Sequence, residues 1–212
     1  MNILAIGSHP DDIEFGCGGT LLRYSEEGHS VYVYVLTKGS LGGDPEIRRA
    51  EQEKAAKVLG AKGLFIGEYE DTRISVDKEL IGDIEQMVNQ IGPEVVFVHF
   101  GQDTHQDHRN LCSAVTSATR FIPTVLFYEG PSTQHFFPAV FVDISSTFRG
   151  KLSALNTHAS QVSRTRVENL TIVDLALATA QFRGTMAHIQ LAEGFVPLRM
   201  MHTIPLTSRS NS

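Results

Sequence analysis

The 212-residue chain has little cysteine and no tryptophan, and it contains no long hydrophobic run. Its two cysteines, Cys17 and Cys112, lie far apart and form no CxxC pair, which excludes a disulfide framework and a thiolate zinc finger. No run reaches the roughly 18 apolar residues that a membrane span needs, and the first residues lack the basic region of a signal peptide. We therefore expect a cytoplasmic protein without a membrane span.

Positive charge is also scarce in most of the chain. Residues 1–144 carry 11 Lys and Arg against 21 Asp and Glu, whereas residues 145–212 carry 7 against 3. An acidic body of this kind argues against nucleic acid as a main partner, because phosphate binding needs a basic stripe. The basic C-terminal third either packs on the acidic part of its own or a neighbouring chain, or forms a solvated face.

Short apolar segments alternate with amphipathic ones along the chain. The predicted strands are Asn2–Gly7, Val31–Leu36, Gly63–Ile66, Glu94–His99, Thr124–Phe127 and Phe137–Val142. The predicted helices are Phe15–Glu27, Glu46–Leu59, Asp77–Ile91, His105–Thr119, Ser145–Asn156 and Arg166–Phe182. This alternation predicts right-handed βαβ crossovers and a Rossmann-like α/β fold, an open, mainly parallel sheet of order 3-2-1-4-5 with helices on both faces. We expect one domain over residues 1–202 and a flexible tail over residues 203–212.

Two polar clusters follow two of the predicted strands. Ser8–Asp12 comes directly after the first strand, and Asp103–His108 comes soon after the fourth. In an open parallel sheet, ligands bind beyond the carboxyl ends of the strands, at the point where the strand order reverses. In the order 3-2-1-4-5 that point lies between strands 1 and 4, so the two clusters are predicted to face each other.

The clusters supply the side chains of a metal site. His9, Asp12 and His108 provide two imidazoles and one carboxylate, a common catalytic zinc set that leaves a position open for water. The same set suits Fe2+ or another divalent transition metal, so the ligand types alone do not decide between Zn2+ and these ions. Zinc lowers the pKa of bound water to about 7 and polarises a carbonyl group.

The remaining polar residues of the clusters suit acid–base roles. Asp11 is adjacent to Asp12 and is placed to accept the proton of the attacking water. His105, three residues before His108, is placed to stabilise an oxyanion or to protonate a leaving amine. Asp107 is placed to orient either histidine.

Other interpretations of the same segments remain open. The His-Pro-Asp-Asp segment is also a plausible turn in which an Asp caps the following helix. Gly16–Gly19 resembles a phosphate loop, but Leu21 stands where the third glycine is needed, so these glycines serve close packing or a helix start instead. The rival functions are a nucleotide-binding Rossmann-like protein without metal hydrolase activity and a non-catalytic interaction module.

The motifs resemble those of the PIG-L/LmbE family of zinc-dependent N-deacetylases, and the resemblance covers residues 1–196. The family's His-Pro-Asp-Asp loop is matched at Ser8–Asp12, and its His-x-Asp-His motif is matched at His105–His108. Lesser signatures are matched at Arg48–Glu51, Asp71, Lys151–Gln161 and Ala192–Phe195. The chain departs from the usual pattern at Ser8 and at Gln106, where Pro is more frequent, and neither change removes a ligand.

The resemblance implies removal of acetyl from an N-acetylglucosamine-type conjugate, a small molecule whose aglycone the sequence does not identify. It implies Arg48 and Asp71 as contacts of the sugar hydroxyls, and it implies a homo-oligomer. It implies His9, Asp12 and His108 as zinc ligands. His158 and Gln161, in the C-terminal signature, are left as structural or interface residues.

Overall fold

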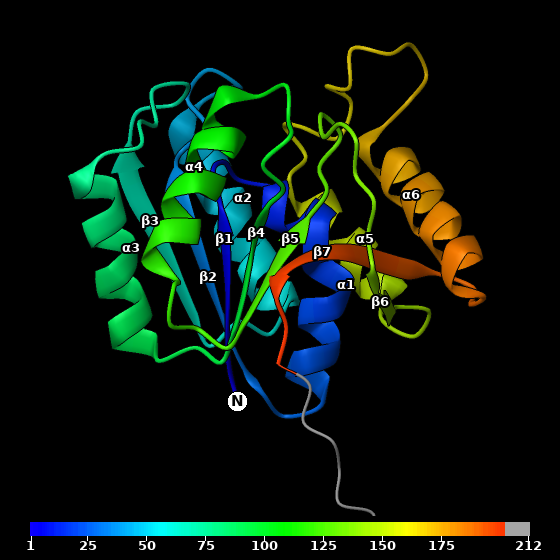
Figure 1. Cartoon of the computed structure of the whole chain (residues 1–212). Helices are drawn as coiled ribbons and strands as arrows, with labels where there is room; N and C mark the ends of the chain where they lie inside the picture. The colour runs from blue at the N-terminus through cyan, green and yellow to red at the C-terminus, as the bar shows by residue number, and fades with distance from the viewer. Residues whose placement is uncertain (202–212) are drawn as a thin grey trace, which may run out of the picture.

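The computed structural model describes residues 1–201, and a seven-stranded sheet lies at its centre (Figure 1). The strands are β1 (Asn2–Gly7), β2 (Ser30–Thr37), β3 (Gly63–Tyr69), β4 (Val95–His99), β5 (Thr124–Tyr128), β6 (Val140–Asp143) and β7 (Ala192–Arg199). The helices are α1 (Asp12–Glu26), α2 (Pro45–Val58), α3 (Lys78–Ile91), α4 (Gln106–Ala118), α5 (Phe148–Thr157) and α6 (Ile172–Ala187).

The sheet has the strand order β3-β2-β1-β4-β5-β7-β6, and its first five strands are parallel. The predicted fold class is therefore confirmed, and the predicted order is extended at the β5 edge by two further strands. β7 runs antiparallel to β5, and β6 runs antiparallel to β7.

Alternate residues of the buried strands face the two layers of helices. Leu4 and Ile6 of β1 pack in the core under α3 and α4, and Ile3 and Ala5 pack in the core under α1. This two-sided burial follows from the period of two in a strand and explains the continuous apolar runs of the sequence. Every residue of β1 and β4 is buried except Asn2, which is half-buried.

Element boundaries differ from prediction mainly in the C-terminal third. β7 was not predicted, and β6 begins at Val140 rather than at Phe137. α6 begins at Ile172 because Thr171 and Asp174 form a capping box that fixes its start. α5 begins at Phe148, and the predicted tail over residues 203–212 lies outside the described residues. Within residues 1–201, no helix is both long enough and apolar enough to span a membrane.

Candidate metal centre and active site

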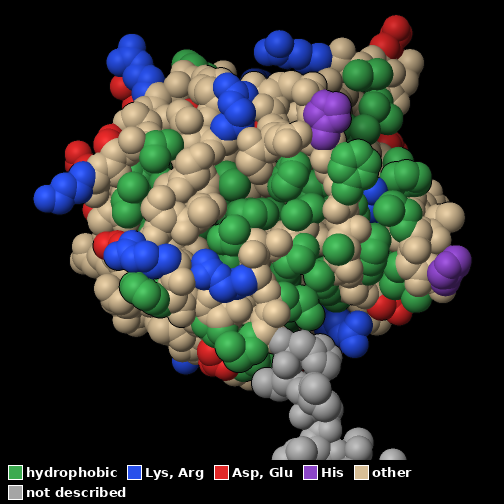
Figure 2. All heavy atoms as spheres, viewed as in Figure 1, with side chains coloured by type: hydrophobic (Ala, Val, Ile, Leu, Met, Phe, Trp, Pro, Cys, Tyr) green, Lys and Arg blue, Asp and Glu red, His purple; other side chains and the backbone are tan. Residues whose placement is uncertain are grey.

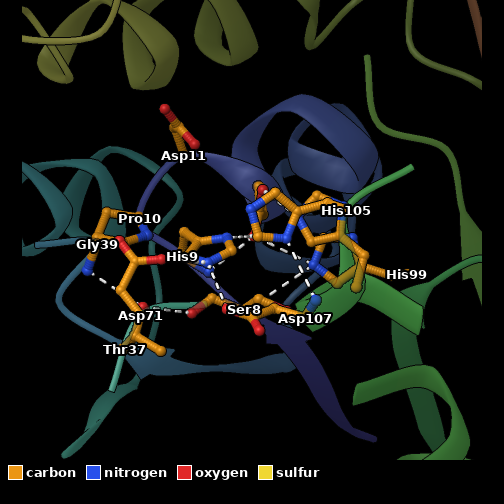
Figure 3. Close-up of polar contacts among 12 residues, drawn as sticks. Ser8, His9, Pro10, Asp11, Thr37, Gly39, Asp71, His99, His105 and Asp107 are labelled. Carbon is orange, nitrogen blue, oxygen red and sulfur yellow. Dashed lines mark hydrogen bonds and ion pairs between the residues drawn. The ribbon is translucent and has the colours of Figure 1, made fainter. Parts of the chain in front are cut away.

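The two polar clusters meet at the carboxyl ends of β1 and β4 (Figure 3). The strands are neighbours, with Ile3 paired to Val95, so the loops that follow them share one edge of the sheet. The ring of His9 lies 4.7 Å from that of His105 and 5.5 Å from that of His108, measured between ring centroids. Strand pairing therefore brings together side chains that are almost a hundred residues apart in the sequence.

Asp12 lies between the two predicted imidazole ligands. Its Oδ2 is 3.3 Å from Nδ1 of His9, and its Oδ1 is 3.4 Å from Nε2 of His108. Oδ2 also accepts a hydrogen bond of 2.7 Å from the backbone N–H of His9, which fixes the loop around the carboxylate. One carboxylate thus lies within 3.4 Å of one nitrogen from each ring.

The second nitrogen of each ring lies against another carboxylate. Nε2 of His9 is 3.1 Å from Asp107 and 3.2 Å from Asp71, and Nδ1 of His108 is 3.2 Å from Asp103. Histidines that bind metals usually have such a carboxylate on the far nitrogen, where it fixes the tautomer and the ring orientation. Nδ1 of His9 and Nε2 of His108 are the nitrogens that face Asp12.

Two further histidines lie beside this pair. His99 stacks on His108 with ring centroids 3.9 Å apart, and its Nε2 accepts a hydrogen bond from the backbone N–H of Ser8. Burial and the charge of His108 lower the pKa of His99 to about 4. Nδ1 of His105 accepts a hydrogen bond from the backbone N–H of Asp107, which leaves Nε2 of His105 to face the cluster.

Several groups at this edge offer ligand atoms within 4.8 Å of one another. These groups are His9 with His105 and His108, Asp12 with His99 and His108, and His9 with Asp71 and Asp107. The predicted trio is not itself one of them, although each of its members belongs to at least one. The overlap defines one cluster with several choices of ligand, so the assignment of His9, Asp12 and His108 stays a prediction.

The electrostatics of the cluster favour a bound cation. Burial lowers the pKa of His9, but hydrogen bonds to the surrounding carboxylates outweigh burial and hold it well above the usual value. Burial also disfavours charge on His108, yet the charge of Asp12 and the neighbouring carboxylates raise its pKa to about 9. Burial raises the pKa of Asp12, whereas the charges of His108 and His99 hold it well below its usual range. The carboxylates thus favour positive charge on the rings, and the imidazole and carboxylate donors of the cluster are ones that suit zinc.

Asp11 differs from Asp12 in conformation and in direction. It has a positive φ of 91°, in a region that non-glycine residues rarely occupy outside functional sites. Its side chain makes no capping hydrogen bond to α1, although it occupies the N-cap position, so the turn-and-cap interpretation does not explain this carboxylate. Figure 3 shows it directed away from the imidazoles. Burial raises the pKa of Asp11 to about 6, although the charges of His158 and Arg48 act to lower it.

A series of buried polar contacts holds the turn at Asp11. The backbone N–H of Asp11 donates to Oε1 of Gln52 over 3.3 Å, and Nε2 of Gln52 donates to Glu14 over 2.7 Å. The other oxygen of Glu14 lies 3.5 Å from Nε2 of His158, and both residues are fully buried. His158 is therefore a buried partner of Glu14 within this chain.

Arg48 and Asp71 lie at the same edge and are both buried. The guanidinium of Arg48 donates to the backbone oxygens of Gly39 and Pro10 and lies 3.7 Å from Asp11. Asp71 accepts a hydrogen bond from the backbone N–H of Leu41. Both side chains line the hollow above the cluster, where their predicted contact with sugar hydroxyls stays a prediction.

Two hollows open on either side of Asp11 and Asp12, and Gln161 lines both of them. The first, of about 380 Å³, is called the polar lobe here; its walls include His9, Arg48, Asp71, His105, His108 and Arg166. The second, of about 270 Å³, is called the apolar lobe; its walls include Phe15, Pro131, Ile172, Leu175, Arg164 and Thr165.

The glycine-rich segment lies inside α1 rather than in a strand–helix loop. A Cβ on Gly16 would lie 2.1 Å from the ring of Tyr128, and one on Gly19 would lie 2.9 Å from Ile144. These glycines therefore permit close packing, as one of the sequence interpretations held. A nucleotide phosphate site needs its glycines at the turn between strand and helix, so the geometry does not favour the nucleotide-binding alternative.

The sequence motifs assigned no role to two residues of the cluster, His99 and Asp103. His99 is the last residue of β4, and a histidine at the carboxyl end of a strand beside the switch point was the available signal. Asp103 belongs to the second polar cluster, but its contact with His108 depends on a loop conformation that no spacing rule predicts.

Comparison with known proteins agrees with this geometry. The family model for PIG-L, described as GlcNAc-PI de-N-acetylase, matches residues 4–119. The chain belongs to the PIG-L family. An uncharacterized deacetylase of Escherichia coli (strain K12), YaiS, is 40% identical over 167 residues, which cover 74% of this chain and 90% of that protein.

Two other PIG-L-like proteins match almost the whole chain. A diacetylchitobiose deacetylase of Thermococcus kodakarensis is 30% identical, over 96% of this chain and 86% of that protein. The solved structure of an N,N'-diacetylchitobiose deacetylase from Pyrococcus horikoshii superposes with a TM-score of 0.83 at 25% identity. The superposition covers 97% of this chain and 87% of the Pyrococcus horikoshii chain. The resemblance stated from the motifs is thereby confirmed, and the relatives are deacetylases.

Proposed function

We propose that this protein is a zinc-dependent hydrolase that removes the acetyl group from a GlcNAc-type N-acetyl sugar conjugate and releases acetate. The observation that carries the proposal is the carboxylate of Asp12 within 3.4 Å of Nδ1 of His9 and Nε2 of His108, in a member of a deacetylase family. The name of the Thermococcus kodakarensis relative, diacetylchitobiose deacetylase, supports an N-acetylated amino sugar as substrate.

A metal ion would be held by Nδ1 of His9, a carboxylate oxygen of Asp12 and Nε2 of His108. Asp107 lies against Nε2 of His9, and Asp103 lies against Nδ1 of His108. These contacts support the choice, because a carboxylate on the far ring nitrogen increases the basicity of the nitrogen that binds the metal. Zn2+ suits two imidazoles and one carboxylate, and Fe2+ is the alternative ion. When bound there, the ion lowers the pKa of a water ligand and polarises the carbonyl of the acetamide.

The neighbouring side chains carry out the proton transfers and position the reacting groups. Asp11 accepts the proton of the attacking water, a role supported by its lack of a capping bond and by its raised pKa of about 6. The Nε2–H of His105 donates a hydrogen bond to the oxyanion, and the proton that Asp11 took from the water passes to the leaving nitrogen. Asp107 keeps His9 in the required tautomer and holds Nδ1 of His105 through its backbone N–H. Arg48 and Asp71 contact sugar hydroxyls from the walls of the polar lobe.

The test is an Asp11→Asn variant loaded with zinc. It should keep stoichiometric metal and lose acetate release from N-acetylglucosamine and diacetylchitobiose, because the amide cannot accept the proton. Asp83→Asn, an exposed carboxylate on α3, is the matched control and should keep both properties. Full acetate release by metal-loaded Asp11→Asn would contradict the assigned base, and a wild-type protein that binds no transition metal would contradict the hydrolase itself.

We also propose that the chain forms a homo-oligomer. Figure 2 shows hydrophobic side chains gathered over the region of β7 and α6. α6 exposes the large apolar side chains of Leu177, Phe182 and Met186. A helix that is apolar all round is normally buried, so a second copy is the expected cover. The cytoplasmic location stays a prediction; both cysteines are free and buried.

A further inference from the structure

The two lobes diverge from the same pair of carboxylates. Asp11, Asp12 and Gln161 line both the polar lobe and the apolar lobe, so the reacting group must lie where the lobes join. An amide carbonyl carbon carries two substituents that point in different directions, the amine and the acyl chain. A substrate whose carbonyl lies beside these carboxylates therefore directs one substituent into each lobe.

The lobes differ in their chemistry. The polar lobe has charged and imidazole walls that suit the hydroxyl groups of a sugar. The apolar lobe has the ring of Phe15, Pro131 and, at the start of α6, Ile172 and Leu175 on its walls, and Ser132, Arg164 and Thr165 add polar groups at its edge. Ile172 and Leu175 pack against the buried cluster that contains Phe15, so these walls are held by the core.

The apolar lobe is larger than an acetyl group requires. Its volume is about 270 Å³, whereas a site for one water molecule, which is close in size to a methyl group, needs only about 10–15 Å³. A methyl group would leave most of the apolar wall in contact with water. Burial of a longer alkyl chain removes that contact and favours binding in proportion to the area covered.

We propose that the apolar lobe is an acyl-chain site and that the enzyme prefers N-acyl amino sugars whose acyl group is longer than acetyl. The inference rests on the proposed function and extends it to the acyl group. Hydrolysis breaks the amide C–N bond, adds the hydroxyl of water to the acyl carbon and a proton to the nitrogen. The products are the free amino sugar and a short-chain carboxylate.

The first test is a chain-length series on the wild-type enzyme. The value of kcat/KM for N-acetyl-, N-butanoyl- and N-hexanoylglucosamine should rise by about fourfold for each methylene that enters the lobe. Binding to the Asp11→Asn variant, measured by calorimetry, should strengthen by the same factor without turnover. Values that stay flat or fall with chain length would overturn the acyl-chain site.

The second test fills the lobe. Leu175→Trp should lower the ratio of hexanoyl to acetyl turnover towards one, because the indole occupies the space of the chain. Gln181→Trp, an exposed position further along α6 that does not line the lobe, is the matched control and should keep the wild-type ratio. An unchanged ratio in folded Leu175→Trp would contradict the assignment.

The outcomes separate this inference from the proposed function. Hydrolysis of the acetyl sugar without any gain from a longer chain overturns the acyl-chain site alone. A binding gain from the hexanoyl chain without hydrolysis of any N-acyl sugar supports the site and overturns the hydrolase. Absence of both gain and hydrolysis overturns both. A gain from an alkyl group on the anomeric oxygen, but none from the N-acyl chain, assigns the lobe to the aglycone and overturns the acyl-chain site.

Discussion

The carboxylate of Asp107 offers a sharp test of how the cluster holds a metal. It is fully buried and accepts hydrogen bonds from Nε2 of His9 at 3.1 Å, from the backbone N–H of Thr72 at 2.8 Å and from that of Ile74 at 3.3 Å. In Asp107→Asn only one oxygen remains to accept them. Whichever way the amide is turned, its NH2 group faces at least one of these donors.

Two magnitudes follow from this geometry. Loss of a carboxylate behind a metal-binding histidine weakens metal binding by about 10–100-fold. A buried donor left without a partner lowers the free energy of unfolding by about 1–3 kcal/mol. We therefore expect Asp107→Asn to bind zinc 10–100-fold more weakly in a competition titration with a chelating dye. Its metal-free form should also unfold at a lower urea concentration.

The control for this prediction is Asp143→Asn, at the end of the edge strand β6. Its exposed carboxylate accepts a hydrogen bond from the backbone N–H of Ser145, and β5 and β7 separate β6 from β4 in the sheet. It should bind zinc as the wild type does. If Asp107→Asn keeps the wild-type circular dichroism spectrum and the wild-type zinc affinity, Asp107 does not orient His9 for metal binding. The choice of Nδ1 of His9 as ligand would then lose its main support.

Three other variants test the remaining assignments. His108→Ala should lose stoichiometric zinc, whereas His99→Ala should retain it, as measured by metal analysis; the reverse result would replace one ligand by the other. Phe182→Asp should lower the molar mass measured by light scattering to that of a monomer, whereas Phe121→Asp, also exposed, should not. Glu193→Gln should lower the free energy of unfolding in urea by about 3–5 kcal/mol, because it leaves a buried lysine without its carboxylate; a loss below 1 kcal/mol would refute that estimate.

The sequence was sufficient to predict which distant clusters meet. Continuous apolar runs predicted parallel strands, and the reversal of strand order placed the loops after β1 and β4 at one edge. His9, Asp12 and His108 lie together for that reason. The carboxylates that contact the far ring nitrogens were harder to predict, because Asp71 and Asp103 reach the rings through loop conformations that residue spacing does not encode.

Charge distribution was informative in a different way. The basic C-terminal third was expected to pack on an acidic body or to be solvated. Arg183 of α6 forms a two-pronged ion pair with Glu129 just after β5, with N–O distances of 2.7 and 2.6 Å. This ion pair joins the basic C-terminal third to the acidic part of the same chain. Other basic residues, such as Arg149, remain exposed, so both interpretations hold for part of the segment.

The strand β7 was missed because its sequence contains two charged residues and a proline, whereas a continuous apolar run was the signal used to predict strands. Glu193 is nevertheless buried, since it accepts hydrogen bonds from the backbone N–H groups of Gly19 and Thr20 and pairs with Lys151 at 2.6 Å. The local sequence pattern cannot reveal such a pairing, because the hydrogen-bond partners of both charged groups lie far away in the chain.

This ion pair also connects the C-terminal third to the chemistry. Nζ of Lys151 donates to the backbone oxygen of Phe15, the acceptor that an α-helix assigns to the N–H of Gly19. The N–H of Gly19 donates to Glu193, so both charged groups of the pair contact the backbone of α1. The first turn of this helix carries Asp12, and Phe15 walls the apolar lobe. The family model ends at residue 119, yet the position of this turn depends on Lys151 and Glu193 beyond it. We therefore expect the C-terminal third to be required for metal binding as well as for stability.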